Sequence, residues 1–486
     1  MRWEHEDKLI PSDGWQFDRF GHSVAVSGDV AVVGAPYDDH NGPETGSAYV
    51  FRYDQVALWP EEAKFVPPIT SSGVRFGSSV SLGDDMALIG AEYEHFTGGA
   101  YVFRLSSPGA WSRDTKLLAS DGQHWDYFGH SISLSDRVAL IGAYGDDDNG
   151  NEAGSAYLCN VSIKWYVDDD NTAGPWYGSQ QYPFQHIQDG IDAASNGESV
   201  IVMPGIYPEN IDFIGKAIVV KSDQGASVTT IDGGQAGSVI RFGNNEAQGS
   251  VIEGFTITNG TAASGGGIYC GNSSPTVTNN IITGNSATLW AYYNGGGGIF
   301  CWYSSPTISN NIFYNNWGNF EGGAIYLGYS SPIILNNTID SNRTEGSGGG
   351  IECAYNSDAT ISNNTFISNE AYLFSGGGLD IWEFSPTVSN NLFKNNFVDD
   401  RGGGISCRYY SFPMIINNTV VENSASAAGG GIHCNRYSSA IVANTVLWGN
   451  SSPSGAEVYL ETGSVLTISF SDVAGGQASV YVEAAG

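Results

Sequence analysis

Residues 348–375 read GGGIECAYNSDATISNNTFISNEAYLFS, and this unit decides the fold because variants of it recur through roughly residues 260–450. The unit occurs seven times with a period of 26–31 residues. Each copy opens with a glycine-rich turn and an apolar residue, and each later carries an Asn-Asn-x-apolar motif. A fixed period of this length is typical of a solenoid, in which each copy forms one coil.

Three apolar columns run through the seven units. The residues that follow the glycines are Ile268, Ile299, Ile325, Ile351, Leu379, Ile405 and Ile432. The Asn-Asn motifs end on Ile282, Phe313, Ile339, Phe366, Phe393, Val420 and Val446. The third column, which precedes the motif, holds Val277, Ile308, Ile334, Ile361, Val388, Ile415 and Ile441. Three inward columns predict a coil of three strands, with equivalent positions about 4.8 Å apart in neighbouring coils. The 3.6-residue spacing that a helical solenoid needs is absent from these units.

The repeats also carry a family resemblance. The Gly-Gly-Ala-Ile element at 322–325 and the Phe-x-x-Asn elements at 313–316 and 366–369 resemble the repeats of polymorphic outer-membrane proteins, within the pectate-lyase-like superfamily. The resemblance covers roughly residues 165–486. It implies a right-handed, three-sheet parallel β-helix of the kind found in bacterial and archaeal cell-surface proteins.

The start of this solenoid is expected at a short helix. In residues 184–196, Phe184, Ile187, Ile191 and Ala194 follow helical spacing. A helix laid across the first coil would protect strand edges that otherwise aggregate. We therefore predict a capping helix at 184–196, a β-helix over 184–486 with its seven regular coils at 260–450, and a joint at 161–183.

The first 160 residues contain a different repeat, with a period of 52–56 residues. Its elements are the Phe-Gly pairs at 20–21, 76–77 and 128–129, the Gly-Ala pairs at 34–35, 90–91 and 142–143, and the aromatic strands that begin at Tyr49, Tyr101 and Tyr157. Alternating apolar runs within each unit predict three or four short strands, the content of one propeller blade.

These units resemble FG-GAP repeats, the blades of integrin-like propellers, and the fold class is therefore expected to be all-β throughout. Two features depart from that family. The strand connection that often carries an Asp-rich calcium loop is only Ser27-Gly28-Asp29 in the first unit. Three blades are also too few for a closed ring, which normally needs four to eight. We expect an open fragment, or a ring completed by other residues or chains.

Composition limits the partners. The chain has 51 acidic and 19 basic residues and a net charge of −32. Such a surface repels a phosphate backbone, so nucleic acid is not an expected partner. No apolar run reaches the roughly 18 residues of a membrane helix. The first residues do not form a signal peptide, yet the resemblances still predict an extracellular or cell-surface location.

Five cysteines recur two positions after the first apolar column: Cys270, Cys301, Cys353, Cys407 and Cys434. Because side chains alternate along a strand, these thiols should point inward as a column of small hydrophobic groups. A disulfide between the neighbours Cys270 and Cys301, or Cys407 and Cys434, is an alternative.

The residue between those two inward positions should point outward. We call these residues the outer row: Tyr269, Phe300, Tyr326, Glu352, Asp380, Ser406 and His433. Trp302, Trp382 and Arg408 follow just beyond it. Aromatic faces at a regular rise can stack on sugar rings while polar groups bind hydroxyls, which predicts a glycan-binding strip. Equally, exposed aromatic residues can simply stack on one another in ladders.

A catalytic alternative uses the same strip. Glu352 and Asp380 occupy equivalent positions in adjacent coils, so they could form the acid and base, or nucleophile and acid, of a glycosidase, with Arg408 and His433 near enough to join them. The motifs of polygalacturonase-like enzymes are not found at suitable places. Residues 197–486 also hold only eight Lys or Arg, so an uncharged glycan is a better ligand than an acidic one. We expect a non-catalytic protein.

Three acidic loops are candidate calcium sites, because calcium prefers oxygen ligands. Their residues are Asp38, Asp39 and Asn41, then Asp146, Asp147 and Asp148, and finally Asp168 and Asp170. The same residue types are ordinary in turns. The sequence therefore predicts a structural or recognition protein of the cell surface, with glycans, other surface proteins or copies of itself as partners.

Overall fold

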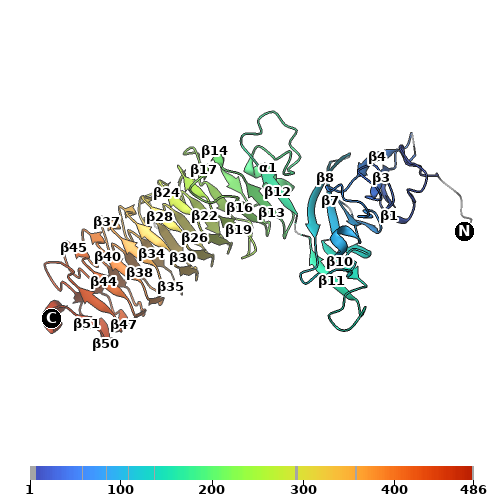
Figure 1. Cartoon of the computed structure of the whole chain (residues 1–486). Helices are drawn as coiled ribbons and strands as arrows, with labels where there is room; N and C mark the ends of the chain where they lie inside the picture. The colour runs from blue at the N-terminus through green and yellow to red at the C-terminus, as the bar shows by residue number, and fades with distance from the viewer. Residues whose placement is uncertain are drawn as a thin grey trace, which may run out of the picture. The chain divides into compact units, whose positions relative to one another are not determined.

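The computed structural model describes residues 7–483 except 57, 84, 108, 136, 162, 291–293 and 356–357. The chain divides into two compact units. The first contains residues up to Lys164 together with Tyr177–Gln181, and the second contains Trp165–Trp176 and Tyr182–Gly486. Figure 1 shows small antiparallel sheets in the first unit and stacked parallel strands in the second. The fold is therefore mostly β, as predicted.

The first unit consists of three antiparallel blades. Blade 1 contains β1 (Ser23–Ser27), β2 (Val30–Ala35), β3 (Ser47–Arg52) and β4 (Glu61–Phe65). Blade 2 contains β5 (Val80–Leu82), β6 (Met86–Gly90), β7 (Ala100–Ser107) and β8 (Ala110–Leu117), with the 3-10 helix η1 (Glu94–Phe96) between β6 and β7. Among the described residues, blade 3 contains three strands, β9 (Ser131–Ser135), β10 (Val138–Ala143) and β11 (Ser155–Asn160). Three or four strands per unit is the predicted content.

Consecutive blades share their cores. Val30 and Val32 of blade 1 pack in one apolar cluster with Phe76, Ile89 and Phe103 of blade 2. The Phe-Gly segments join the blades through the backbone, because Gly46 bridges to Phe76 and Gly98 bridges to Phe128. One recurring contact therefore links blade 1 to blade 2 and blade 2 to blade 3.

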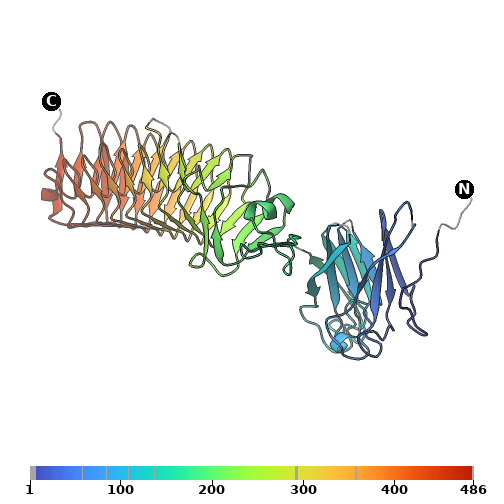
Figure 2. The same cartoon turned by 90° about the horizontal axis from the view of Figure 1, so that it is seen from above.

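The second unit is a solenoid of about ten coils with three long parallel sheets (Figure 2). The first sheet contains β12 (Lys164–Val167), β13 (Ser199–Val202), β16 (Val219–Ser222), β19 (Val251–Glu253), β23 (Thr276–Thr278), β27 (Thr307–Ser309), β31 (Ile333–Leu335), β35 (Thr360–Ser362), β39 (Thr387–Ser389), β43 (Met414–Ile416), β47 (Ser439–Ala443) and β50 (Val465–Ser469). The second contains β14 (Gly205–Tyr207), β17 (Thr229–Asp232), β20 (Thr256–Thr258), β24 (Ile281–Thr283), β28 (Ile312–Tyr314), β32 (Thr338–Asp340), β36 (Thr365–Ile367), β40 (Leu392–Lys394), β44 (Thr419–Val421), β48 (Val446–Trp448) and β51 (Asp472–Val473).

The third sheet carries the outer row. It contains β15 (Ile211–Asp212), β18 (Ile240–Phe242), β22 (Ile268–Gly271), β26 (Ile299–Trp302), β30 (Ile325–Gly328), β34 (Ile351–Ala354), β38 (Leu379–Trp382), β42 (Ile405–Arg408), β46 (Ile432–Cys434), β49 (Val458–Leu460) and β52 (Val480–Val482). A narrow fourth ladder of two-residue strands contains β21 (Thr261–Ala262), β25 (Ser286–Ala287), β29 (Trp317–Gly318), β33 (Arg343–Thr344), β37 (Glu370–Ala371), β41 (Phe397–Val398) and β45 (Ser424–Ala425). A second 3-10 helix, η2 (Gly476–Ser479), follows near the end.

The predicted cap is present as helix α1 (Ile187–Ala193), with Ile187 and Ile191 buried in the core of the solenoid. The solenoid nevertheless begins before residue 184, where we placed its start. The strand β12 already belongs to the first sheet, and residues from Trp165 onward belong to the second unit. Part of the predicted joint is therefore the first strand of the solenoid.

The three predicted columns form the core, with one error of register in the last coil. Ile441 and Val446 are exposed, whereas Val442 and Leu447 are buried and pair with Ile415 and Val420 of the preceding coil. The physical reason is that this coil has Thr445 where the other coils have the second Asn. The hydroxyl Oγ1 of Thr445 accepts the backbone N–H of Asn418 at 3.3 Å.

The two asparagines of each motif have separate roles. The first has a left-handed backbone, as at Asn363 with φ 56°. The second is buried and part of a ladder: the Asn364 side-chain oxygen Oδ1 accepts the backbone N–H of Asn337 at 2.9 Å, and its amide Nδ2 donates to the carbonyl of Ile334 at 2.9 Å. The five cysteines of the predicted column are also buried inside the solenoid, and all are free thiols.

Candidate functional site

The outer row lies side by side on the third sheet, as the spacing predicted. Glu352 pairs in register with Asp380, and Asp380 with Ser406. The side chains point away from the solenoid core, but they do not form an exposed strip. All members except Tyr269 are buried, and Asp380, Ser406 and His433 have no exposed surface. The predicted exposure of the row is therefore wrong.

The glycine-rich turns explain this burial. The first glycine of each triplet has a left-handed backbone, with φ 66° at Gly348 and 71° at Gly376. A Cβ atom added at Gly348 or Gly376 would lie only 2.8 or 2.6 Å from the Cβ of Glu352 or Asp380. The turns thus pass directly over the outer row, and only glycine allows so close an approach.

Aromatic members of the predicted strip stack on one another. Phe300 lies between Tyr269 and Tyr326, with ring centroids 5.6 and 5.3 Å apart. The hydroxyl-bearing rings of Tyr303 and Tyr329 form a similar stack at 4.8 Å. Tyr326 is fully buried and is therefore no ligand-binding surface. These residues form the ladders that were the alternative to a continuous sugar-binding strip.

A pocket of about 560 Å³ nevertheless opens beside the middle of the row. Its aromatic lining consists of Phe320, Tyr355, Phe374, Trp382 and Tyr409. Its polar lining consists of Glu321, Ser347, Glu352, Ser375, Asp400, Arg401, Arg408, Asn435, Arg436 and Glu461. Of the predicted site residues, the structure thus brings Glu352, Trp382 and Arg408 to one pocket. The predicted Tyr269, Phe300 and Trp302 line a second pocket of about 410 Å³.

Arg408 organises the charges of the pocket beside Glu352. Its Nε donates to both carboxylate oxygens of Asp380, at 2.9 and 3.1 Å, and its Nη2 also binds that carboxylate. The same Nη2 donates to the Ser347 hydroxyl at 2.9 Å and lies 3.6 Å from Glu352 Oε1. Burial alone would lower the pKa of Arg408, but Asp380 and Glu352 outweigh it and raise that pKa.

Glu352 is different from Asp380. Among the described residues, neither of its carboxylate oxygens has a hydrogen-bond partner. Burial raises the pKa of Glu352 well above its usual range, and the charges of Asp380 and Glu321 raise it further, while Arg408 opposes them. Burial also raises the pKa of Asp380, but the charge and hydrogen bonds of Arg408 oppose that rise more strongly than they do at Glu352.

His433 lies behind the pocket wall. Its Nε2 is 3.5 Å from Glu461 Oε1, and its Nδ1 is 3.4 Å from the Ser406 hydroxyl. Burial lowers the pKa of His433. The nearby imidazole of His433 lowers the pKa of Glu461, which also pairs with Arg401. His433 therefore positions Glu461 and does not line the pocket itself.

Two family models match the chain. The FG-GAP repeat matches residues 3–51, 59–103 and 111–159, and a model described as a right handed beta helix region matches 216–396. The chain joins FG-GAP repeats to a right-handed β-helix. Among solved structures, the pectin methylesterase from carrot is similar, with 12% identity over 66% of this chain and 88% of that chain and a TM-score of 0.25. No curated protein matches the chain.

Sequence reasoning missed the wall of the pocket that the turns of the β-helix supply. Phe320, Phe374 and Arg401 come from the segments that precede the glycine triplets. These segments vary in length and residue type from coil to coil, so no repeated residue at a fixed position identifies them in the sequence. The one usable signal is the residue directly before each triplet, because Glu321, Ser347 and Arg401 all stand there and all line the pocket.

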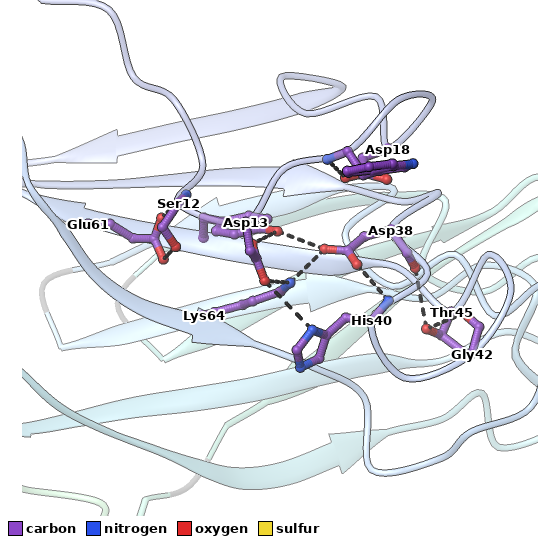
Figure 3. Close-up of polar contacts among 11 residues, drawn as sticks. Ser12, Asp13, Asp18, Asp38, His40, Gly42, Thr45, Glu61 and Lys64 are labelled. Carbon is purple, nitrogen blue, oxygen red and sulfur yellow. Dashed lines mark hydrogen bonds and ion pairs between the residues drawn. The ribbon is translucent and has the colours of Figure 1, made fainter.

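The acidic loop of the first FG-GAP blade binds an ammonium group of the chain itself (Figure 3). Asp38 Oδ2 accepts the Tyr49 hydroxyl at 2.7 Å and pairs with Lys64 Nζ at 2.8 Å. Asp13 contacts the same two groups, at 2.8 Å and 2.7 Å. Asp39 instead accepts the backbone N–H of Glu44. The charge next to Asp38 is therefore the side chain of Lys64.

In the other two acidic loops, aspartate side chains accept hydrogen bonds from backbone N–H groups two residues later, as is common in turns. Asp146 Oδ1 accepts the backbone N–H of Asp148 at 3.1 Å, and Asp168 Oδ1 accepts that of Asp170 at the same distance. In the described part of the chain, no three His, Cys, Asp or Glu side chains gather closely enough to hold a metal ion. Calcium at the three loops, including Asn41 and Asp147, stays a prediction. The described helices include none long and apolar enough to cross a membrane.

Proposed function

We propose that this protein is an extracellular or cell-surface recognition protein that binds a neutral glycan in the pocket beside Glu352 of its β-helix. The observation that carries the proposal is the composition of this pocket, where five aromatic rings and several carboxyl groups surround about 560 Å³. Aromatic faces stack on sugar rings, and carboxylates accept hydrogen bonds from hydroxyl groups.

A neutral ligand fits the charges better than an acidic one. Arg408 is already paired with Asp380, and Arg401 with Glu461. The guanidinium of Arg436 lies 4.1 Å above the ring of Tyr409. The basic groups of the pocket are therefore engaged, and a uronate would add negative charge beside Glu321 and Glu461. The likeness of the repeats to those of polymorphic outer-membrane proteins supports the location.

A glycan array tests the proposal. The wild-type chain should bind one or more neutral oligosaccharides, and Trp382→Ala should weaken this binding at least about tenfold, because a stacking ring is lost. Trp448→Ala is the matched control, since Trp448 is an exposed tryptophan on the second sheet, outside the pocket. Absence of binding to every glycan, or equal losses in both variants, would contradict a glycan site here.

Glycoside hydrolysis is the second candidate, and one observation favours it. Glu352 lines the pocket, and burial raises the pKa of its carboxyl group well above the usual range. A protonated carboxyl group at neutral pH is what a glycosidase needs to protonate the leaving oxygen. Asp380, whose carboxylate group Arg408 binds, would then be the second carboxyl group of the pair.

Reducing-end release from every bound glycan separates the two candidates. Under the binding proposal, the wild-type chain releases no sugar. Release by the wild type that Glu352→Gln and Asp380→Asn both abolish, while binding persists, would make the protein a glycosidase. Release that persists in Glu352→Gln would point to a contaminating enzyme.

A further inference from the structure

Blade 3 exposes an apolar face that its two sister blades bury. Val138, Leu140 and Leu158 are 40%, 44% and 75% exposed. Strand pairing shows that the equivalent residues are Met86, Leu88 and Val102 in blade 2, and Val30, Val32 and Val50 in blade 1. All six of these are at most 4% exposed, because the following blade covers them. The open face of blade 3 thus has the chemistry of a blade-to-blade contact.

Blade 1 has the opposite half of the same contact. Val24 and Val26 of β1 are each 69% exposed. The equivalent of Val24 in blade 2 is Val80, which is 9% exposed against blade 1. Blade 1 therefore exposes the face that in blade 2 packs on the preceding blade. Blade 3 exposes the face that in blades 1 and 2 packs on the following blade.

Backbone features of the contact are also present at both ends. Gly46 and Gly98 have φ values of 80° and 88°, and each bridges to the phenylalanine of the next blade. Gly154 of blade 3 has the same conformation, with φ 75°, but has no such bridge within the described residues. Phe20 of blade 1, the equivalent of Phe76 and Phe128, also has no such bridge among the described residues.

The residues before Phe20 match a fourth strand, which blade 3 does not have within the described residues. In blades 1 and 2, the fourth strand ends near a lysine that stands twelve positions before the next Phe-Gly pair: Lys64 before Phe76, and Lys116 before Phe128. Lys8 stands at the same distance before Phe20, and each lysine is followed by a large apolar residue. Residues 8 and 9 therefore correspond to the end of a fourth strand.

Lys64 and Lys116 each have a defined electrostatic partner in the blade that their strand completes. Lys64 pairs with Asp38, which binds Tyr49, and Lys116 pairs with Glu94, which binds Tyr101. In blade 3 the same acid–tyrosine pair is formed by Asp146 and Tyr157, at 2.7 Å. No ammonium group contacts this pair in the described part of the chain, so its complement is a lysine such as Lys8.

We propose that two copies of this chain associate head to tail, with blade 1 of one copy stacked on blade 3 of the other. Lys8 of the first copy then pairs with Asp146 of the second, and the segment at Leu9 continues the three-stranded sheet at β11. Phe20 bridges to Gly154 across the contact. Because the two surfaces are different patches of one chain, the contact can repeat into a ring or a filament. The proposal does not depend on glycan binding.

Sedimentation velocity of the full chain over a range of concentrations tests this contact. The wild type should self-associate. Leu158→Asp should weaken association at least about tenfold, because it places a carboxylate in the apolar contact. Lys8→Glu should weaken it as well, whereas Lys8→Arg should preserve it. Leu158 and Lys8 are exposed in the single chain, so these variants should fold as the wild type does, which circular dichroism checks.

Phe470→Asp is the matched control, because Phe470 is 92% exposed but lies in the β-helix. Association that Leu158→Asp and Lys8→Glu reduce, and that Phe470→Asp leaves unchanged, supports the proposal. A wild-type chain that stays monomeric at every concentration overturns it, whatever covers the face instead. Association that only Phe470→Asp reduces also overturns it, and places the contact on the solenoid.

Discussion

At the scale of single residues, Glu352 has a buried carboxyl group that is held close to two other carboxyl groups. Its raised pKa makes the folded state bind a proton more tightly than the unfolded state does. Between the unfolded and the folded pKa, unfolding therefore releases a proton. The contribution of this group to stability consequently falls as the pH rises through that range.

Glu352→Gln should remove this pH dependence. The variant should gain stability relative to the wild type as the pH rises from 5 to 8, by about 1.4 kcal/mol or more, the equivalent of one pKa unit. Urea unfolding at both pH values measures the difference. Glu383→Gln, at an exposed position in the next coil, is the control and should leave the pH dependence unchanged. A constant difference between Glu352→Gln and the wild type would mean that Glu352 is ionised in the folded protein.

The sequence predicted which residues share the outer row, but not their burial. Strand alternation fixes the direction of a side chain, and the pairing of Glu352 with Asp380 follows from the repeat. Burial depends on the segments that pass over the row, such as the turn at Phe374, and these segments are not repetitive. The pocket was therefore beyond prediction, although its members Glu352, Trp382 and Arg408 were identified.

At the scale of one element, the Asn-Asn motif allows two neighbouring positions to be compared with the same substitution. Asn363→Gly should change the free energy of unfolding by less than about 0.5 kcal/mol, because glycine also adopts the left-handed backbone of this position. Asn364→Gly should destabilise the protein by about 2 kcal/mol or more, since it leaves the Ile334 carbonyl and the Asn337 N–H without partners. Urea unfolding compares the two, and equal effects would exclude a structural ladder.

The register error in the last coil has the same origin. We aligned the motif on its asparagines. The second position of the motif requires a buried side chain that accepts a hydrogen bond, and Thr445 also meets this requirement. The alignment therefore slipped by one residue, and a slip of one reverses which side chains face the core. Val442 and Leu447 are the apolar residues that the pattern should have included.

At the scale of the whole molecule, repeat length predicted both architectures, but the limits of each unit were less well predicted. The strand β12 precedes the capping helix in sequence and still belongs to the first sheet of the solenoid. The strand β12 lies outside the repeated units, so no repeated motif identifies it in the sequence. Similarly, only the strand count of the folded chain reveals that blade 3 has three strands, not four, in the part of the chain that the structure describes.

The two units have separate apolar cores, and this should be visible in thermal unfolding. The core of the solenoid contains Ile361, whereas the core between blades 1 and 2 contains Ile89, and the two clusters share no residue. A chain with two cores need not unfold in one step. We therefore expect two calorimetric transitions for the wild-type protein.

Core substitutions assign these transitions. Replacing a buried isoleucine by alanine costs about 2–5 kcal/mol, enough to lower the Tm of one cooperative unit by several degrees. Ile89→Ala should therefore lower one transition and leave the other unchanged, while Ile361→Ala should do the reverse. If each substitution shifted both transitions equally, or if the wild type unfolded in a single transition, the two cores would form one cooperative unit. In that case, association between the blades of neighbouring copies would also stabilise the β-helix and its pocket against unfolding.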